Sequence, residues 1–356
     1  MEVTFEKILQ ALSHVVEPDL KKDIIALDLV SNIEYKEGVV RFDLKISNPA
    51  LHNKKRIQEA CEHQLKRFLG AEVKMQANIT AMGKAHERKP QHRTTLPGVK
   101  HIIAVASGKG GVGKSTIAAN LAAGLAKKGY SVGLIDADIY GPSVPAMFDV
   151  SQEKPSTIKI NDKEYIKPVE SYGVKMLSIG FFATPDQAAV WRGPMATKAL
   201  TQLFNDAYWG ELDYMIVDLP PGTGDVHLTL VQQIPLSGVV LVSTPQEIAL
   251  VDVRKAIAMF SMPQIKIPIL GLVENMAYFS PEELPDHKYY IFGKSGAKDL
   301  AKKMDINYLA EVPIVQSIRE AGDIGRPAVL QKNTKLSKIL DQFVEKTVSS
   351  VKNPKQ

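Results

Sequence analysis

The sequence predicts an α/β protein in which a doubly wound, mostly parallel sheet follows a small α+β domain. Short apolar runs alternate with amphipathic segments after residue 98, which is typical of strands buried on both faces of a parallel sheet. A glycine-rich loop stands between the first of these runs and the first helical segment. The segment 85–98 is basic and holds two prolines, which favours a linker. We therefore expect domains at 1–84 and 99–356, joined by a linker at 85–98.

The first domain shows a compact α+β pattern. Apolar residues from Phe5 to Leu12 recur at helical spacing, and the pattern ends near Glu17. We expect strands over 24–30, 39–46 and 72–79 and a helix over 53–69. About 80 residues can form a small domain of modest stability.

The larger domain repeats a strand and helix pattern. A helix is expected over 115–128, because Ile117, Leu121 and Leu125 share one face and Gly129 follows as a stop signal. A last amphipathic helix is expected over 336–348, docked on the core. Strands are expected over 101–106, 131–135, 214–217, 239–242 and 267–273.

Composition excludes several classes of protein. With 45% hydrophobic and 23% charged residues, the chain has enough apolar surface to build a core. A net charge of +5 does not call for nucleic acid as a partner. The single cysteine, Cys61, excludes an internal disulfide framework and a cysteine-pair metal site within one chain. There is no secretory leader pattern and no run of about 18 apolar residues, so the cytoplasm is expected and a membrane is not.

The strongest motif is the glycine-rich loop, which reads G-K-G-G-V-G-K-S over 108–115 and fits G-x-x-x-x-G-K-[ST]. Its backbone N–H groups and the following helix N-terminus favour phosphate oxygens. Lys114 is expected to reach the β- and γ-phosphates of ATP, and the Ser115 hydroxyl to bind Mg²⁺. The expected ATP-binding residues of this loop are Gly108, Lys109, Gly110, Gly111, Val112, Gly113, Lys114, Ser115 and Thr116.

Three carboxylates follow predicted strands. Asp136 and Asp138 stand where a strand ends, at the edge that faces the phosphate loop in a doubly wound fold. We expect Asp136 to hold Mg²⁺ through water, and Asp138 to orient the attacking water or accept its proton. Asp218 ends another apolar run, a Walker B pattern, and is expected to support Mg²⁺ through water. The P-P-G-T-G stretch after it resembles the switch II loop that senses the γ-phosphate. Its glycines allow a mobile turn, and the resemblance implies that Gly222 contacts the γ-phosphate.

The second lysine of the loop, Lys109, gives the form K-G-G-x-G-K-[ST], which resembles the deviant Walker A loop of the SIMIBI class of ATPases. In that class the extra lysine reaches the nucleotide of a partner subunit. The resemblance implies a homodimer that sandwiches two ATP molecules, with Lys109, Lys114 and Asp138 as catalytic residues. It also implies that Asn275 and Pro313, which follow two later strands, frame the adenine base. A side-chain cap of a turn is the alternative for these two positions.

Five short motifs follow one another over 107–276, in the order K-G-G-V-G-K-S, D-A-D-I-Y-G-P-S, V-D-L-P-P-G-T-G-D, T-P-Q-E and E-N-M. They closely resemble the Mrp/ApbC family of iron–sulfur cluster carriers. Segments 16–20 and 23–30 resemble the small MIP-type iron–sulfur-assembly domain of bacterial members. The resemblance implies an ATP-hydrolysing carrier that binds clusters and transfers them to apoproteins. It implies ATP and Mg²⁺ as cofactors, with a second copy and iron–sulfur apoproteins or assembly factors as partners.

One departure from the family concerns cysteine. Members carry a C-x-x-C pair shortly after E-N-M, but residues 278–293 contain no cysteine, and 47–51 lack the usual loop cysteine of the small domain. His287 is interpreted as a surface residue, and Cys61 as a buried structural thiol in a helix. Two alternatives therefore stay open. One is a ParA/MinD-type partition or positioning ATPase that binds DNA or membrane. The other is an ATP-driven assembly factor or switch that binds no cluster.

Overall fold

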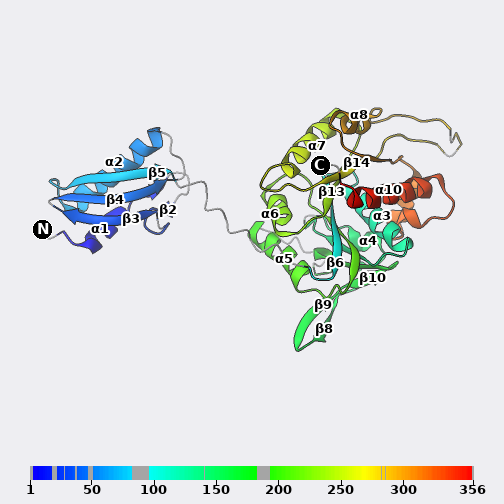
Figure 1. The fold of residues 1–356 in the computed structure, drawn as a ribbon, viewed down its shortest axis with the longest axis horizontal. Coiled ribbons are helices and arrows are strands. Elements are labelled where there is room, and N and C mark those ends of the chain that lie inside the picture. The colour runs from blue at the N-terminus through cyan, green and yellow to red at the C-terminus, as the bar shows by residue number, and fades with distance from the viewer. Residues whose placement is uncertain are drawn as a thin grey trace. The chain divides into compact units, whose positions relative to one another are not determined.

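The computed structural model describes residues 3–17, 22–27, 29–36, 38–46, 51–81, 96–139, 141–182, 193–281, 283–284 and 286–354. The chain divides into two compact units, residues 1–90 and 91–356, which are described separately (Figure 1). Most of the predicted linker, 85–95, lies outside the described residues, as do 18–20 and the cysteine-free segment 47–50. None of the described helices is long and apolar enough to cross a membrane.

The small unit packs two helices on one face of a three-stranded sheet. Its strands lie in the order β3-β4-β5, with β3 antiparallel and β5 parallel to the central strand. Alternation along β4 turns Val40, Phe42 and Leu44 into the core, where they meet Ile8 and Cys61 from the helices. The elements are α1 (Phe5–Leu12), β1 (Val16–Glu17), β2 (Lys22–Asp23), β3 (Val30–Lys36), β4 (Val39–Ile46), α2 (Leu51–Leu69) and β5 (Lys74–Ala81).

The strand predicted over 24–30 is wrong. Residues 24–27 form a turn, because the Asp23 Oδ1 atom accepts the Ala26 N–H at 2.7 Å. Ile24 and Leu29 are buried, so these apolar residues belong to the core although the backbone at Ile24 is not extended. The strand begins at the last residue of the predicted run, as β3.

The larger unit holds an eight-stranded sheet in the order β10-β11-β7-β12-β6-β13-β14-β15, parallel except for the edge strand β10. The doubly wound class is confirmed. Its strands are β6 (Val99–Ser107), β7 (Val132–Asp136), β10 (Val169–Ser171), β11 (Val174–Ser178), β12 (Leu212–Asp218), β13 (Gly238–Ser243), β14 (Ile269–Glu274) and β15 (Tyr308–Glu311). The five predicted strands correspond to β6, β7, β12, β13 and β14, although β14 begins two residues late.

Helices cover both faces of this sheet (Figure 1). One face packs against α5 (Gly193–Asn205), α6 (Asp225–Gln233), α7 (Glu247–Phe260) and α8 (Gly296–Lys303). The other packs against α3 (Lys114–Lys127), α4 (Val144–Met147), α9 (Gln316–Asp323) and α10 (Lys335–Lys352). Two 3₁₀ turns, η1 (Ile179–Phe181) and η2 (Ala328–Leu330), complete these layers. The expected helices 115–128 and 336–348 are α3 and α10.

One hairpin was not predicted from the sequence. Strands β8 (Ser156–Ile160) and β9 (Lys163–Lys167) pair antiparallel and project from the unit (Figure 1). Their turn residues Asn161 and Asp162 both have positive φ, as a tight hairpin turn requires.

Strand order decides where the candidate site lies. Because β12 lies between β6 and β7, Asp218 pairs in register with Asp136 on one side and Val105 on the other. The carboxyl ends of three parallel strands therefore meet beside the loop that follows β6.

Candidate active site

The glycine-rich loop joins β6 to α3 in a conformation that requires glycine. Gly111 and Gly113 have φ of 79° and 83°, in the left-handed region. Gly113 caps α3 without a side chain, which leaves the first N–H groups of the helix available to an anion. At Gly108 a Cβ atom would lie 2.3 Å from the backbone of Asp252 in α7, so only glycine fits. The loop therefore has the geometry of a phosphate cradle.

Asn275 supports this loop from the end of β14. Its buried Nδ2 atom donates to the Val112 carbonyl at 2.8 Å. A Cβ atom on Gly113 would lie 2.2 Å from that Nδ2 atom, so the two residues are in close contact. Pro313 is buried just after β15, where the Ala277 N–H donates to the Val312 carbonyl at 2.9 Å. The two expected adenine contacts thus lie in hydrogen-bonded neighbouring segments, and their contact with a base remains a prediction.

Lys114 contacts two of the three predicted carboxylates. The Lys114 Nζ atom lies 2.6 Å from Oδ1 of Asp218 and 3.5 Å from Oδ2 of Asp138. It also lies 3.3 Å from the Ser115 hydroxyl oxygen. The structure therefore brings together four predicted site residues, which are Lys114, Ser115, Asp138 and Asp218.

Asp136 is held in place by donors from three segments. Its Oδ1 atom accepts the Asp138 N–H at 3.1 Å, and its Oδ2 atom accepts the Val144 N–H at 3.2 Å. The Ser178 hydroxyl donates to the same Oδ2 atom at 3.0 Å. The sequence analysis did not predict Ser178. The only indication in the sequence is a serine at the end of the short, mostly apolar segment 174–178. This buried serine fixes the direction of the Asp136 carboxylate.

Burial perturbs the acids of the site. Burial, together with the nearby charge of Asp218, raises the pKa of Asp136 to about 7. Burial also raises the pKa of Asp218, while the charge of Lys114 acts in the opposite direction. Within the described ranges the buried Oδ2 atom of Asp218 has no hydrogen-bond partner. A divalent cation would satisfy this oxygen, so the residues present fit Mg²⁺.

Gly222 does not point a free N–H at the loop. Its φ is 88°, and its N–H donates to the Ser107 carbonyl at 3.0 Å. The N–H group of Gly222 is therefore bound to the strand that leads into the phosphate loop. To donate to a γ-phosphate, it would have to break its hydrogen bond to Ser107.

Lys109 stands apart from the other predicted catalytic residues. Its carbonyl accepts the Ser107 hydroxyl at 2.8 Å, and its side chain is half-buried. None of the ion pairs between described residues of this chain involves its ammonium group. Thr116, at the start of α3, offers its carbonyl to Asn120 at 2.8 Å.

No thiol lies in this site. Cys61 is fully buried in α2 of the small unit, and burial raises the pKa of its thiol to about 12. The prediction of a buried structural thiol is confirmed, and His287 is exposed as expected. Among the described residues, no group of three or more histidine, cysteine, aspartate or glutamate side chains could hold a metal ion by itself, so a cation at Asp218 would also need the Ser115 hydroxyl and water.

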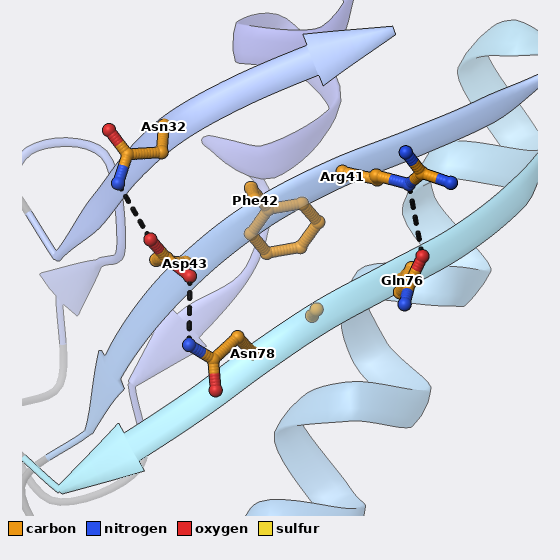
Figure 2. Close-up of a pocket in the computed structure, with 7 residues that line it drawn as sticks. Asn32, Arg41, Phe42, Asp43, Gln76 and Asn78 are labelled. Carbon is orange, nitrogen blue, oxygen red and sulfur yellow. Dashed lines mark hydrogen bonds between the residues drawn. The ribbon is translucent and has the colours of Figure 1, made fainter. Parts of the chain in front are cut away.

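A hollow of about 570 Å³ lies on the polar face of the small unit's sheet. Figure 2 shows the residues that line it. Asp43 accepts amide donors from Asn32 at 2.7 Å and Asn78 at 3.0 Å, and Arg41 donates to Gln76 at 3.0 Å. The two amide bonds hold the pKa of Asp43 below its usual value. The Asp43 carboxylate is therefore held in its ionised form, unlike Asp136 in the larger unit, whose pKa is raised.

Both units match known families. Residues 98–348 match the family model described as NUBPL iron-transfer P-loop NTPase, and residues 6–75 match that of an iron-sulfur cluster assembly protein. The chain is 41% identical over 330 residues to an iron-sulfur cluster carrier protein of Synechocystis, which covers 93% of this chain and 92% of the relative. It is 48% identical over 246 residues to the iron-sulfur cluster transfer protein NUBPL of Dictyostelium discoideum, which covers 69% of this chain and 74% of the relative.

Solved structures agree on the fold. A nucleotide-binding protein from Archaeoglobus fulgidus in complex with ADP matches with a TM-score of 0.58 and 38% identity, over 68% of this chain and 93% of that one. The cell division ATPase MinD of Pyrococcus furiosus matches with a TM-score of 0.50 and 22% identity, over 70% of this chain and 98% of that one. At that identity the likeness to MinD concerns the fold alone.

Proposed function

The chain belongs to the family of NUBPL-type iron-transfer P-loop NTPases, and from this we propose that it is an ATP-hydrolysing carrier of iron–sulfur clusters. The cluster is its cargo, bound or passed on to apoproteins, and the ATP cycle drives the transfer. The observation that carries the ATPase part is the burial of Lys114 between Asp138 and Asp218 beneath a glycine-rich loop.

The hydrolysis step uses groups already placed around that lysine. The phosphates of ATP would bind the loop N–H groups and draw Lys114 away from the two carboxylates. Water would attack the γ-phosphorus in line and lose its proton to Asp138 as ADP leaves. Ser115, Asp136 and Asp218 would hold Mg²⁺, the last two through water, and the ion would offset charge on the phosphate oxygens.

A second copy would complete the site. Because the Lys109 ammonium has no ion-pair partner among the described residues of its own chain, it is available to the nucleotide of a facing subunit. We therefore propose a homodimer that closes around two ATP molecules, with Lys109 acting in trans.

The test combines hydrolysis and transfer in one assay. Purified protein, ferrous iron, sulfide and Mg-ATP would be mixed anaerobically with an apo-ferredoxin, and the visible absorbance of the ferredoxin cluster followed. We expect faster cluster formation with ATP than with ADP, and no ATP effect for Asp138→Asn. Equal rates with and without ATP, in a protein that hydrolyses ATP, would contradict the carrier function while leaving the ATPase intact.

The cysteine content favours a second candidate, an ATP-driven assembly factor that binds no cluster itself. The chain's one cysteine is buried and far in sequence from the site. Thiolates are the usual ligands of such clusters. Under this candidate ATP would still accelerate the ferredoxin assay, but the protein itself would retain no iron after desalting. A ParA/MinD-type role has no support beyond the shared fold.

A further inference from the structure

A buried histidine follows the loop that carries Gly222. His227 is the third residue of α6 and is 2% exposed. Its Nδ1 atom lies 3.1 Å from the Pro220 carbonyl oxygen. Because a carbonyl can only accept, the proton of the neutral ring sits on Nδ1, and this N–H donates to Pro220.

The other ring nitrogen has no partner. Nε2 is buried and makes no hydrogen bond within the part of the chain that the structure describes. Beside it stands the ring of Phe260, 5.8 Å away between centroids. An unpaired buried acceptor is unfavourable, so an apolar side chain would fill this space with less penalty. What the histidine adds over an apolar residue is therefore the Nδ1–H bond to Pro220.

That bond holds one end of a short loop. Leu219 N–H donates to the Val105 carbonyl at 3.0 Å, which fixes the start of the loop to β6. Pro220 is buried and has no backbone N–H. Its carbonyl is therefore the group that can hold it by a hydrogen bond. Two residues on, the Gly222 N–H is bound to the Ser107 carbonyl at 3.0 Å. Gly222 must leave Ser107 to reach a phosphate, whereas the bond from His227 to Pro220 need not break.

We propose that His227 is a positioning residue for the nucleotide reaction, which anchors Pro220 so that only the Gly222 end of the loop moves to the γ-phosphate. The inference rests on the proposed ATPase function. It predicts a specific defect: loosening Pro220 should weaken recognition of a triphosphate, which Gly222 contacts, and spare a diphosphate, which the glycine-rich loop holds by itself.

The test compares His227→Leu, which removes the donor, with His227→Asn, whose amide N–H can replace Nδ1. Calorimetry on the full chain would give the dissociation constants for Mg-ADP and for the non-hydrolysable Mg-AMPPNP. In the leucine variant we expect AMPPNP binding to weaken by up to about tenfold, the range of one lost hydrogen bond, with a lower kcat and ADP binding unchanged within about twofold. The asparagine variant should restore most of the AMPPNP affinity.

Two outcomes would overturn the inference. Equal weakening of ADP and AMPPNP binding would mean a structural role, and unchanged AMPPNP binding in the leucine variant would mean no role. If the leucine variant does not fold, nitrogen NMR of wild-type His227 decides, since a proton on Nε2 in place of Nδ1 excludes the bond to Pro220. A wild-type protein that binds neither nucleotide would overturn both the proposed function and this inference.

Discussion

The Nζ atom of Lys114 lies 2.6 Å from Oδ1 of Asp218, and both side chains are almost fully buried. The lysine that is expected to meet phosphate thus has a carboxylate partner within its own chain. Removing one member of a buried ion pair leaves the other charge uncompensated in a low-dielectric site. The lysine is therefore part of the packed site as well as of its chemistry.

Lys114→Ala should abolish ATP hydrolysis and also lower the free energy of unfolding by about 3 kcal/mol. Adding Asp218→Asn to it should recover part of that stability without recovering activity, because the buried Asp218 charge no longer stands without its lysine. Urea denaturation of the four proteins of this cycle measures the coupling. The matched control is Lys128→Ala, which breaks a surface pair with Glu345 and should change stability by less than about 1 kcal/mol. Wild-type turnover in folded Lys114→Ala would contradict the assignment of the phosphate loop.

Lys109→Ala should act across subunits. Alone it should hydrolyse ATP poorly, and Asp138→Asn likewise. Mixed together they should form heterodimers in which one site has lost both residues and the other neither, so the mixture should regain part of the activity. Normal hydrolysis by Lys109→Ala at every protein concentration would rule out the sandwich dimer.

Gly113→Ala should impair nucleotide binding. The position has a φ of 83°, and an added Cβ atom would lie 2.2 Å from the Asn275 Nδ2 atom that holds the loop. An alanine there costs about 1–2 kcal/mol in backbone energy alone, so we expect ADP affinity to fall more than tenfold. The control is Gly322→Ala in α9, where nothing lies within 4 Å of the new Cβ atom. That variant should bind ADP normally and gain up to about 1 kcal/mol of stability.

The isolated protein should hold a cluster poorly. A dimer would supply two thiols, one Cys61 per subunit, where a [4Fe–4S] cluster normally takes four. Anaerobic reconstitution followed by desalting and iron counting should leave less than about one cluster per dimer. A stoichiometric cluster that disappears in Cys61→Ser would contradict this and make Cys61 a ligand.

The Cys61 thiol itself should be inert in the folded protein. Because burial raises its pKa to about 12, almost none is thiolate at neutral pH. Iodoacetamide should therefore modify it only after denaturation, as followed by mass spectrometry. Rapid modification of the native protein would show that α2 opens readily.

His227 should make the protein less stable in acid. Burial first, and then the charge of Lys114, lowers the pKa of this histidine from its ordinary 6.5 to about 4. The unfolded chain then binds the extra proton first, so stability falls as pH drops from 6.5 to 4, by at most roughly 3 kcal/mol from this group. His227→Leu should flatten that part of a stability curve measured in urea. An unchanged slope would mean that the ring is accessible to solvent.

The sequence by itself predicted which residues could carry the chemistry, and it determined on which elements most of them lie. The loop over 108–115, Asp136 and Asp218 could be placed because each motif is local: a strand, a few residues and a helix start. The alternation of apolar runs with helices was enough for a parallel sheet, because such strands are buried on both faces. The strand predicted over 24–30 was wrong because buried apolar residues also occur in turns. Here a hydrogen bond from the Ala26 N–H to the Asp23 side chain stabilises a turn.

Only the tertiary structure decided which of these residues touch. Lys114 meets Asp218 across 104 positions of sequence, and Asn275 meets Val112 across 163. The hydrogen bonds from the Ser178 hydroxyl to Asp136 and from the Gly222 N–H to the Ser107 carbonyl also join residues far apart in sequence. No local sequence pattern predicts them. Each contact follows from the order of strands in the sheet, which brings the ends of β6, β7, β11, β12 and β14 to one edge. Strand order depends on how the whole sheet packs, and periodicity along one strand carries no information about its neighbours.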